Sequence, residues 1–280
     1  MRVAGRTGTG ERVLISVCIA LFLVWNAAPL LWLMLSSLMQ QAALTTRPPD
    51  FSPASFTLDN YVQVFQSAAQ LGRGLMNSII VAVGTTALAL ILGAPAAYAL
   101  ARLDLPARNP LLLMVLAAQM FPAVVVAIPL FITASRMGLI DSKLTLILVY
   151  LTFNLPIVIW VLRGFFAGIP AGLERAARMD GATIWQTFRL IVLPISLPSL
   201  FAAAIFSFIE AWNEFFFALI LTRQESQTVP LVISAFAGQY QTLFGQMMAA
   251  ATISIAPVVV LAILLRKTIL TGFADGMLKG

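Results

Sequence analysis

The sequence contains no histidine, a single cysteine and few charged residues. Without histidine the chain can form neither an imidazole metal site nor a histidine-based catalytic triad. The one cysteine, Cys18, excludes a disulfide within the chain. Only 10% of the 280 residues are charged, against about 25% in an ordinary soluble domain. This is too little polar surface for a cytosolic enzyme, a disulfide-stapled secreted module or a disordered chain.

Apolar residues dominate instead, at 60% of the chain, with a mean hydropathy of +0.96. They form runs near the roughly 20 residues that a helix needs to cross a bilayer. The first run is too long for a signal peptide and is interpreted as a retained span. The sequence therefore predicts an all-α membrane protein with a tail at residues 1–12 and a single transmembrane domain at 13–280. Its six transmembrane helices are expected near residues 13–37, 75–100, 110–135, 144–161, 191–221 and 246–265.

The distribution of basic residues predicts the orientation. With the N-terminus inside, twelve Lys and Arg residues fall on the inner side and five on the outer side. This bias follows the positive-inside rule, with both termini cytoplasmic. The net charge of +6 is therefore attributed to topology and lipid headgroups, and not to a nucleic acid.

Proline and glycine within the spans predict how the helices bend and pack. Each proline inside a span removes a backbone donor and is expected to bend its helix. Gly84 and Gly93 in the second span predict close approach of a neighbouring helix.

The segment at residues 162–190 is expected to be cytoplasmic and to contain two short helices joined by a turn. Gly181 is a natural left-handed stop for the first helix, and Thr183 with Gln186 forms a capping-box pattern for the second. Leu173, Ala176 and Ala177 are expected to form one apolar face of the first helix. Such a segment could dock a soluble partner or lie as an amphipathic helix on lipid, and physical reasoning alone leaves both open.

A family resemblance favours docking. Ala176-Ala177, then Gly181, then Ile191-x-Leu193-Pro194 have the spacing of the EAA loop, and 179–182 resembles the core of that loop in its carbohydrate-uptake branch. The loop is typical of the membrane subunits of bacterial binding-protein-dependent ABC importers, such as the maltose permeases. Further matches along the chain are Thr57-Leu58-Asp59-Asn60-Tyr61, Asn77-Ser78, Asn154-Leu155-Pro156, Arg163-Gly164-Phe165-Phe166, Trp212-Asn213-Glu214-Phe215 and Lys279-Gly280.

The resemblance implies which residues couple the chain to an ATPase. The expected set is Glu174, Arg175, Ala176, Ala177, Asp180, Gly181, Ile191, Leu193 and Pro194. One position departs from the family, because Arg175 stands where most relatives have an acid and the acid is one residue earlier, at Glu174. The departure argues against a salt bridge from position 175 to the ATPase, whereas the caps and the apolar face remain.

The resemblance also implies the partners. They are a second permease subunit, two cytoplasmic ABC ATPase subunits that hold ATP and Mg, and an extracytoplasmic solute-binding protein, assembled at the bacterial plasma membrane. This chain has no Gly-x-x-x-x-Gly-Lys-Ser/Thr motif and so no P-loop of its own. It is expected to be a non-catalytic subunit without cofactor or metal, which moves a sugar or sugar-like solute into the cytoplasm by alternating access.

Polar residues inside the spans are candidates for the solute pathway. Glu210 and Glu214 are four residues apart, as on one helical face, with Asn213 beside them and Trp212 as a candidate stacking surface for a sugar. A carboxylate at the bilayer centre costs about 2.5–3.5 kcal/mol, so we expect these groups to face a wet passage. Two plainer interpretations stay open: Glu214 is a passive group at the outer mouth, or Asn154 only caps carbonyls freed by Pro156.

Two other classes of protein compete with the importer. The alternative is a proton-coupled secondary transporter that uses Glu210 and Glu214 as its acids. The short chain, the lack of an inverted repeat and the EAA-like loop disfavour it. A membrane-embedded enzyme is disfavoured by the missing histidine and the lack of a nucleophile–base cluster.

Overall fold

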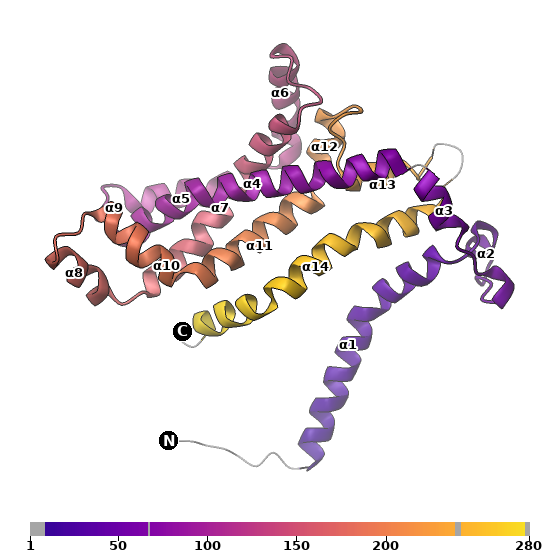
Figure 1. Cartoon of the computed structure of the whole chain (residues 1–280), viewed down its shortest axis with the longest axis horizontal. Coiled ribbons are helices and arrows are strands. Elements are labelled where there is room, and N and C mark those ends of the chain that lie inside the picture. Colours follow the sequence, from indigo (N-terminus) through magenta and orange to yellow (C-terminus); the bar gives the residue numbers. More distant parts are fainter. Residues whose placement is uncertain (1–8, 67, 239–241, 278–280) are drawn as a thin grey trace. The chain divides into compact units, whose positions relative to one another are not determined.

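The computed structural model describes residues 9–66, 68–238 and 242–277, so the Lys279-Gly280 ending and residues 1–8 of the predicted tail lie outside it. Within these ranges the regular elements are helices, and the only β pairing is two isolated bridges, Met39–Phe56 and Ala237–Thr242. The all-α prediction is therefore confirmed (Figure 1). The helices are α1 (Thr9–Ser37), α2 (Gln41–Thr45), η1 (Pro53–Ser55), α3 (Asp59–Gln66), α4 (Ala68–Arg102), α5 (Arg108–Ala118), α6 (Ala123–Arg136), α7 (Lys143–Gly168), α8 (Ala171–Met179), α9 (Ile184–Thr187), η2 (Phe188–Val192), α10 (Leu193–Ile195), α11 (Leu197–Asn213), α12 (Phe216–Leu221), α13 (Val229–Ser234) and α14 (Phe244–Met277).

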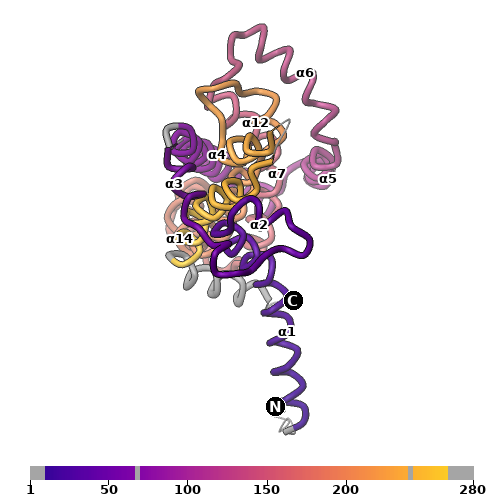
Figure 2. Tube along the Cα trace, turned by 90° about the vertical axis from the view of Figure 1, so that its right-hand side faces the viewer, coloured from indigo at the N-terminus to yellow at the C-terminus, as the bar shows by residue number. Residues whose placement is uncertain are grey.

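Four of the described helices are long and apolar enough to cross a membrane: α1, α4, α7 and α14. Two further candidates are bent pairs, α5 with α6 at 84° and 184–195 with α11 at 78°. The described chain thus offers four spans, or up to six if each bent pair is one span. The bent pairs coincide with the third and fifth predicted spans, so the count of six remains a prediction. The turn from α5 into α6 can be followed in Figures 1 and 2.

Both bends occur beside prolines. Pro122 immediately precedes α6 and has extended backbone, with φ −60° and ψ 128°. Proline disfavours helical geometry in the residue before it and lacks an N–H for the preceding turn, which explains the break between α5 and α6. The second bend is at Ser196, between Pro194 and Pro198. By contrast, α4 continues through Pro95 and α7 through Pro156.

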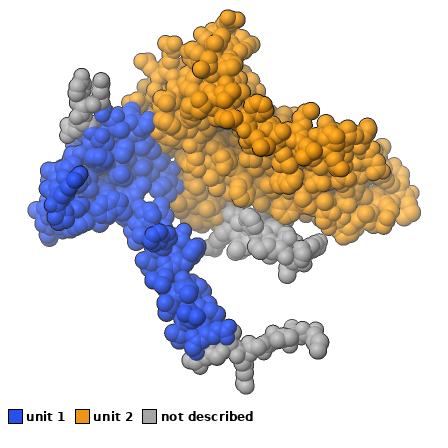
Figure 3. Space-filling view, turned by 180° about the vertical axis from the view of Figure 1, so that it is seen from behind, with its two compact units in different colours: residues 1–68, 233–255 blue, residues 69–232, 256–280 orange. Residues whose placement is uncertain are grey.

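The contacts divide the chain into two compact units, residues 69–232 with 256–280 and residues 1–68 with 233–255, coloured in Figure 3. In the larger unit α4 packs closely against α7. A Cβ atom at Gly84 would lie 2.8 Å from Ile147 Cδ1, and one at Gly93 would lie 2.8 Å from Val158 Cγ1. The close approach predicted at these glycines is confirmed.

Helix α7 continues to Gly168, beyond the predicted end of the fourth span near Val161. The added turns carry Leu162 and Phe166, which are fully buried in the core that α7 shares with α4 and η2. Burial of these side chains explains why the helix does not stop at the predicted position.

In the smaller unit α3 closes the end of α1. The side-chain amide of Asn60 donates to the carbonyl oxygens of Ser37 and Met39, at 3.0 and 2.8 Å. The hydroxyl groups of Tyr61 and Ser37 are 2.7 Å apart. The motif 57–61 therefore satisfies carbonyls that the end of a helix leaves unpaired. Along α1 itself the most apolar 18-residue window is 0% buried, so this helix presents its apolar surface to lipid or to another protein.

In the larger unit, the start of α4 holds the segment at residues 222–229. The side-chain amide of Asn77 donates to the carbonyl oxygens of Glu225 and Gln227, at 2.8 and 2.9 Å. The backbone N–H of Val229 donates to the Ser78 hydroxyl at 2.9 Å. The Asn77-Ser78 motif is thus a brace between α4 and this segment.

Asp141, between α6 and α7, forms hydrogen bonds with the same segment. Its carboxylate accepts the backbone N–H groups of Arg223, Gln224, Glu225 and Ser226 at 2.9–3.1 Å, and the Ser226 hydroxyl at 2.8 Å. Partial burial acts to raise the pKa of Asp141, but these hydrogen bonds outweigh it and hold the pKa well below its usual range. The backbone at Asp141 is left-handed, with φ 64°.

Replacing this carboxylate should loosen the segment. In Asp141→Asn the amide tolerates left-handed backbone but loses charge-assisted bonds of about 1.5–3 kcal/mol. We expect hydrogen-exchange protection of the amides at 223–226 to fall at least tenfold at pH 7. Because the folded pKa is depressed, wild-type protection should be full above the unfolded value of about 3.9 and decline as the pH falls below it.

Asp104→Asn, in the exposed turn after α4, is the matched control and should leave this protection unchanged. Equal protection of residues 223–226 in wild type and Asp141→Asn would show that the carboxylate does not hold the segment.

Candidate functional site

The segment between α7 and α11 folds as two short helices joined by a tight turn, as predicted. Gly181 has φ 87°, in the left-handed region that favours glycine, and its N–H donates to the Arg178 carbonyl at 3.1 Å. The Thr183 hydroxyl accepts the N–H of Gln186 at 3.2 Å, and the Gln186 side chain accepts the N–H of Thr183 at 2.8 Å. The glycine stop and the capping box are both confirmed.

The side of α8 that is buried within the subunit carries an acidic residue. Leu173, Ala176 and Ala177 were expected on one apolar face, but only Ala177 is buried, together with Glu174. Arg175 and Ala176 are exposed on the other side of the helix. The expected apolar face is thus mostly exposed, with Ala177 at its buried edge, and its use as a docking face stays a prediction.

Glu174 is turned inward by partners on the last turn of α4. Its carboxylate lies 3.1 Å from Nε of Arg102 and accepts a hydrogen bond from the Tyr98 hydroxyl at 3.0 Å. The Arg102 guanidinium also donates to the carbonyl oxygen of Ile169, just past the end of α7. Arg178, one turn along α8 from Glu174, interacts with the Tyr98 hydroxyl as well.

Tyr98 and Arg102 were missed as site residues. The available signal was their spacing, since residues four apart place two polar side chains on the same face at the end of a helix. Their partner could not be read from the sequence, because Glu174 is far away along the chain and only the fold brings it to α4.

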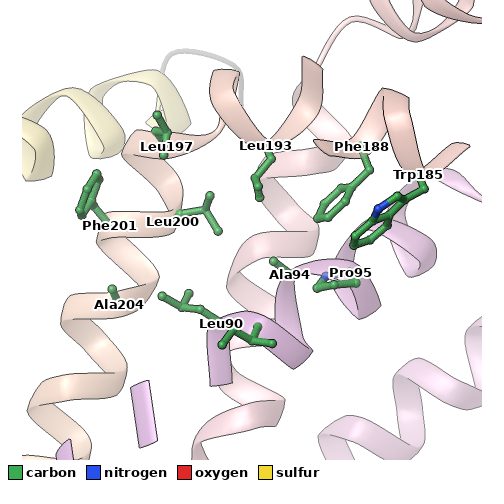
Figure 4. Close-up of a pocket in the computed structure, with 11 residues that line it drawn as sticks. Leu90, Ala94, Pro95, Trp185, Phe188, Leu193, Leu197, Leu200, Phe201 and Ala204 are labelled. Carbon is green, nitrogen blue, oxygen red and sulfur yellow. The ribbon is translucent and has the colours of Figure 1, made fainter. Parts of the chain in front are cut away.

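Aromatic and aliphatic side chains anchor the rest of the segment. Phe188 is buried against Tyr98, with ring centroids 5.0 Å apart, and against Trp185 at 5.4 Å. Phe188 and Trp185 line an apolar groove of about 420 Å³ between α4 and α10–α11 (Figure 4). Of the three predicted residues beyond the second helix, Leu193 lines this groove, Ile191 is half-buried and Pro194 is exposed.

Of the pathway candidates, Glu210 and Asn213 lie on an exposed face of α11. Phe206, Glu210 and Asn213 are all exposed and follow one another at spacings of four and three residues, which places them along one side of the helix. The opposite side, with Phe208 and Trp212, is buried in an apolar cluster shared with α7. A carboxylate and an amide are therefore presented on a surface that the described chain does not cover.

Glu214 does not share this face. Helix α11 ends at Asn213, and the Glu214 carboxylate accepts the N–H groups of Phe217 and Ala218 at 2.9 and 3.3 Å, capping α12. The predicted common face of Glu210 and Glu214 is wrong, because the helix breaks between them. Trp212 is buried and stacks on Phe208, with ring centroids 5.6 Å apart, so the structure gives it a packing role.

Asn154 is buried within α7. Its side-chain amide donates to the Tyr150 carbonyl at 3.1 Å, one turn back along the helix. Its side-chain oxygen is buried without a hydrogen-bond partner among the described residues. Asn154 thus bonds to a backbone carbonyl of its own helix, but this carbonyl is not the one freed by Pro156, so the structure does not show the expected capping.

No metal site accompanies these residues. Across the described ranges, no three His, Cys, Asp or Glu side chains come close enough to hold an ion. The arrangement offers two features: the two-helix segment at residues 169–196, here named the capped segment, at one end of α4, and an exposed polar face on α11.

Solved structures and characterised proteins resemble this chain over almost its whole length. A bacterial ABC transporter that imports the acidic polysaccharide alginate superposes on it with a TM-score of 0.74, covering 95% of this chain and 99% of that chain at 22% identity. This likeness supports the fold.

Sequence relatives are more similar. The trehalose transport system permease protein SugB of Mycobacterium tuberculosis is 38% identical over 255 residues, 90% of this chain and 92% of that protein. The sulfoquinovosyl glycerol transport system permease protein SmoH of Agrobacterium fabrum is 35% identical, over 94% of this chain and 93% of that protein. The trehalose/maltose transport system permease protein MalG of Thermococcus litoralis is 33% identical, over 96% and 98%.

The match to a family model covers residues 89–271, which include the capped segment, the last turn of α4 and the exposed face of α11. Together with the relatives that align over nine-tenths of its length, this shows that the chain belongs to the family of binding-protein-dependent transport system inner membrane components.

Proposed function

We propose that this protein is a permease subunit of an ATP-driven ABC importer that carries a sugar into the bacterial cytoplasm by alternating access. The observation that carries the proposal is its 33–38% identity, over almost the full length, to permeases of trehalose, sulfoquinovosyl glycerol and trehalose/maltose transport systems. A disaccharide or glycoside of similar size is the substrate class that these relatives have in common. The partner set is a second permease, two ATPase subunits and a solute-binding protein.

The orientation proposed from the basic residues places both termini and α8 on the cytoplasmic side. Several residues counted for that bias, including Arg2, Arg6 and Lys279, lie outside the described ranges. Arg102 and Arg178 lie in the described part, at the end of α4 and in α8.

The exposed side of α8 is the proposed docking surface for an ATPase. It presents Arg175, Ala176 and Met179, of which Met179 is 82% exposed. A small residue beside a flexible apolar one allows close approach of a partner. Because Glu174 is used inside the subunit, Arg175 supplies the outward charge, and an acidic partner residue is the complementary group.

The exposed side of α11 is the proposed lining of the solute pathway. Carboxylate and amide oxygens accept hydrogen bonds from sugar hydroxyl groups, and Glu210 and Asn213 offer such groups on one face. Facing them to lipid would cost about 2.5–3.5 kcal/mol for the carboxylate alone. A water-filled passage between two permease subunits removes that cost.

The proton-coupled alternative gains no support. Glu214 caps α12 with both of its oxygens, so protonation would break hydrogen bonds that hold the helix start. This leaves Glu210 without the second acid that the alternative assigned to it.

A charge on the docking surface should release the ATPase. In Met179→Asp the side chain is already exposed, so folding should be unaffected, but a carboxylate is placed in an apolar contact. We expect the yield of P-loop ATPase that co-purifies with the permease to fall at least tenfold. Ala107→Asp is the control, since Ala107 is exposed in the turn after α4 and its left-handed backbone suits aspartate. Normal ATPase yield with Met179→Asp would contradict the docking surface.

Removing the charge of Glu210 should affect solute handling only. In Glu210→Gln the amide still bonds to hydroxyl groups, so uptake should remain ATP-dependent while the KM for sugar changes several-fold. The test is uptake by vesicles across a panel of trehalose, maltose and diacetylchitobiose. The comparison is Glu214→Gln, which should lower thermal stability by weakening the α12 cap. Loss of accumulation and of pH dependence in Glu210→Gln would instead indicate proton coupling.

A further inference from the structure

One guanidinium group ties three helices together where the capped segment meets the membrane helices. Arg102 is the last residue of α4, and its side chain pairs with Glu174 in the first turn of α8 and donates to the Ile169 carbonyl after α7. Side-chain accessibility is 14% for Arg102 and 9% for Glu174. The pair is thus largely shielded from water, and a shielded charge that loses its partner is strongly destabilised.

The same turn of α4 also contacts η2, in the second half of the capped segment. Tyr98 donates to Glu174 in α8 and packs its ring on Phe188 in η2, with centroids 5.0 Å apart. Phe166 of α7 meets both rings edge-on, with centroids 6.3 Å from each. Helix α8 is therefore held by Tyr98 and Arg102, and η2 by Tyr98 alone, so that α8 is directly connected to the end of α4.

Helix α4 is able to carry a displacement of α8. It runs unbroken for 35 residues, roughly 50 Å at 1.5 Å per residue. Within this helix Asn77, about 38 Å from Arg102 at 1.5 Å per residue, donates to the carbonyl oxygens of Glu225 and Gln227. One helix thus joins the capped segment to the segment at 222–229.

We propose that Arg102 is the positioning residue that transmits ATPase-driven movement of α8 to α4. The inference rests on the proposed function, in which an ATPase docks on the outward side of α8. The two sides of α8 then have separate roles, because Arg175, Ala176 and Met179 receive the movement while Glu174 passes it to Arg102. A guanidinium suits this contact because its charge is spread over several N–H groups, so that it can pair with a carboxylate and donate to a carbonyl at the same time.

The experiment measures the number of sugar molecules imported per ATP hydrolysed by the complete transporter in vesicles, with whichever of trehalose, maltose and diacetylchitobiose is transported best. Arg102→Ala should still co-purify with the ATPase and hydrolyse ATP within about twofold of wild type, because the docking surface is intact. The imported sugar per ATP should fall at least tenfold. Arg102→Lys should be intermediate, since it keeps the charge that pairs with Glu174 but lacks the planar set of N–H groups that also reaches the Ile169 carbonyl.

Arg108→Ala is the matched control. Arg108 is a half-buried arginine close by in sequence, but it bonds to the Ala101 carbonyl and has no bond to α8 among the described residues. Its sugar-to-ATP ratio should equal that of wild type. In Arg102→Ala with Glu174→Ala together, the ratio should be no lower than in either single variant, because the two residues act as one joint.

A wild-type sugar-to-ATP ratio in Arg102→Ala would overturn the proposal. If transport and hydrolysis both fell by the same factor, the ratio would also be unchanged, and the pair would only stabilise the structure. Should Arg102→Ala fail to fold, the same ratio is read in Arg102→Lys and Glu174→Gln, and unchanged ratios in both would overturn it. Failure of wild type to import any sugar with ATP would refute the proposed function, separately from the joint.

Discussion

The cost of leaving a polar group unpaired inside a membrane protein governs this structure. Three acids in or beside its helices meet that cost in three different ways. Glu174 turns inward to an arginine, Glu214 caps the start of a helix, and Glu210 stays on an exposed face. The first two have partners within the chain, whereas the third needs water, solute or a second protein. That difference is why Glu210, and not the other two acids, is proposed to line the solute pathway.

Helix α4 is where the satisfied polar groups gather. Asn77 and Ser78 near its start hold the segment at 222–229, which Asp141 grips from another loop. Tyr98 and Arg102 at its end hold the capped segment. Between the two ends Gly84 and Gly93 let α7 approach closely, and side-chain packing fixes the two helices together. The Asn77-Ser78 motif and the capped segment, which are far apart in the sequence, are thus both involved in contacts of one helix.

The sequence was most informative where the signal was local. Apolar runs predicted the helices, Gly181 predicted a left-handed turn, and Thr183 with Gln186 predicted a cap, because each depends on neighbours within four residues. It failed where a contact spans many residues. The pairing of Glu174 with Arg102 was missed, and the common face of Glu210 and Glu214 was wrong because the helix ends at Asn213. Helical spacing assumes an unbroken helix, and it carries no information about which distant helix supplies a partner.

The driving force of transport is the most direct point at which the proposed importer can be tested. Vesicles containing this subunit with its partner permease, ATPases and binding protein can be loaded with ATP or given a proton gradient separately. Uptake of trehalose, maltose or diacetylchitobiose should require ATP on the side of the ATPases and should persist when the proton gradient is abolished. Uptake that follows the proton gradient in the absence of ATP would contradict an ATP-driven importer.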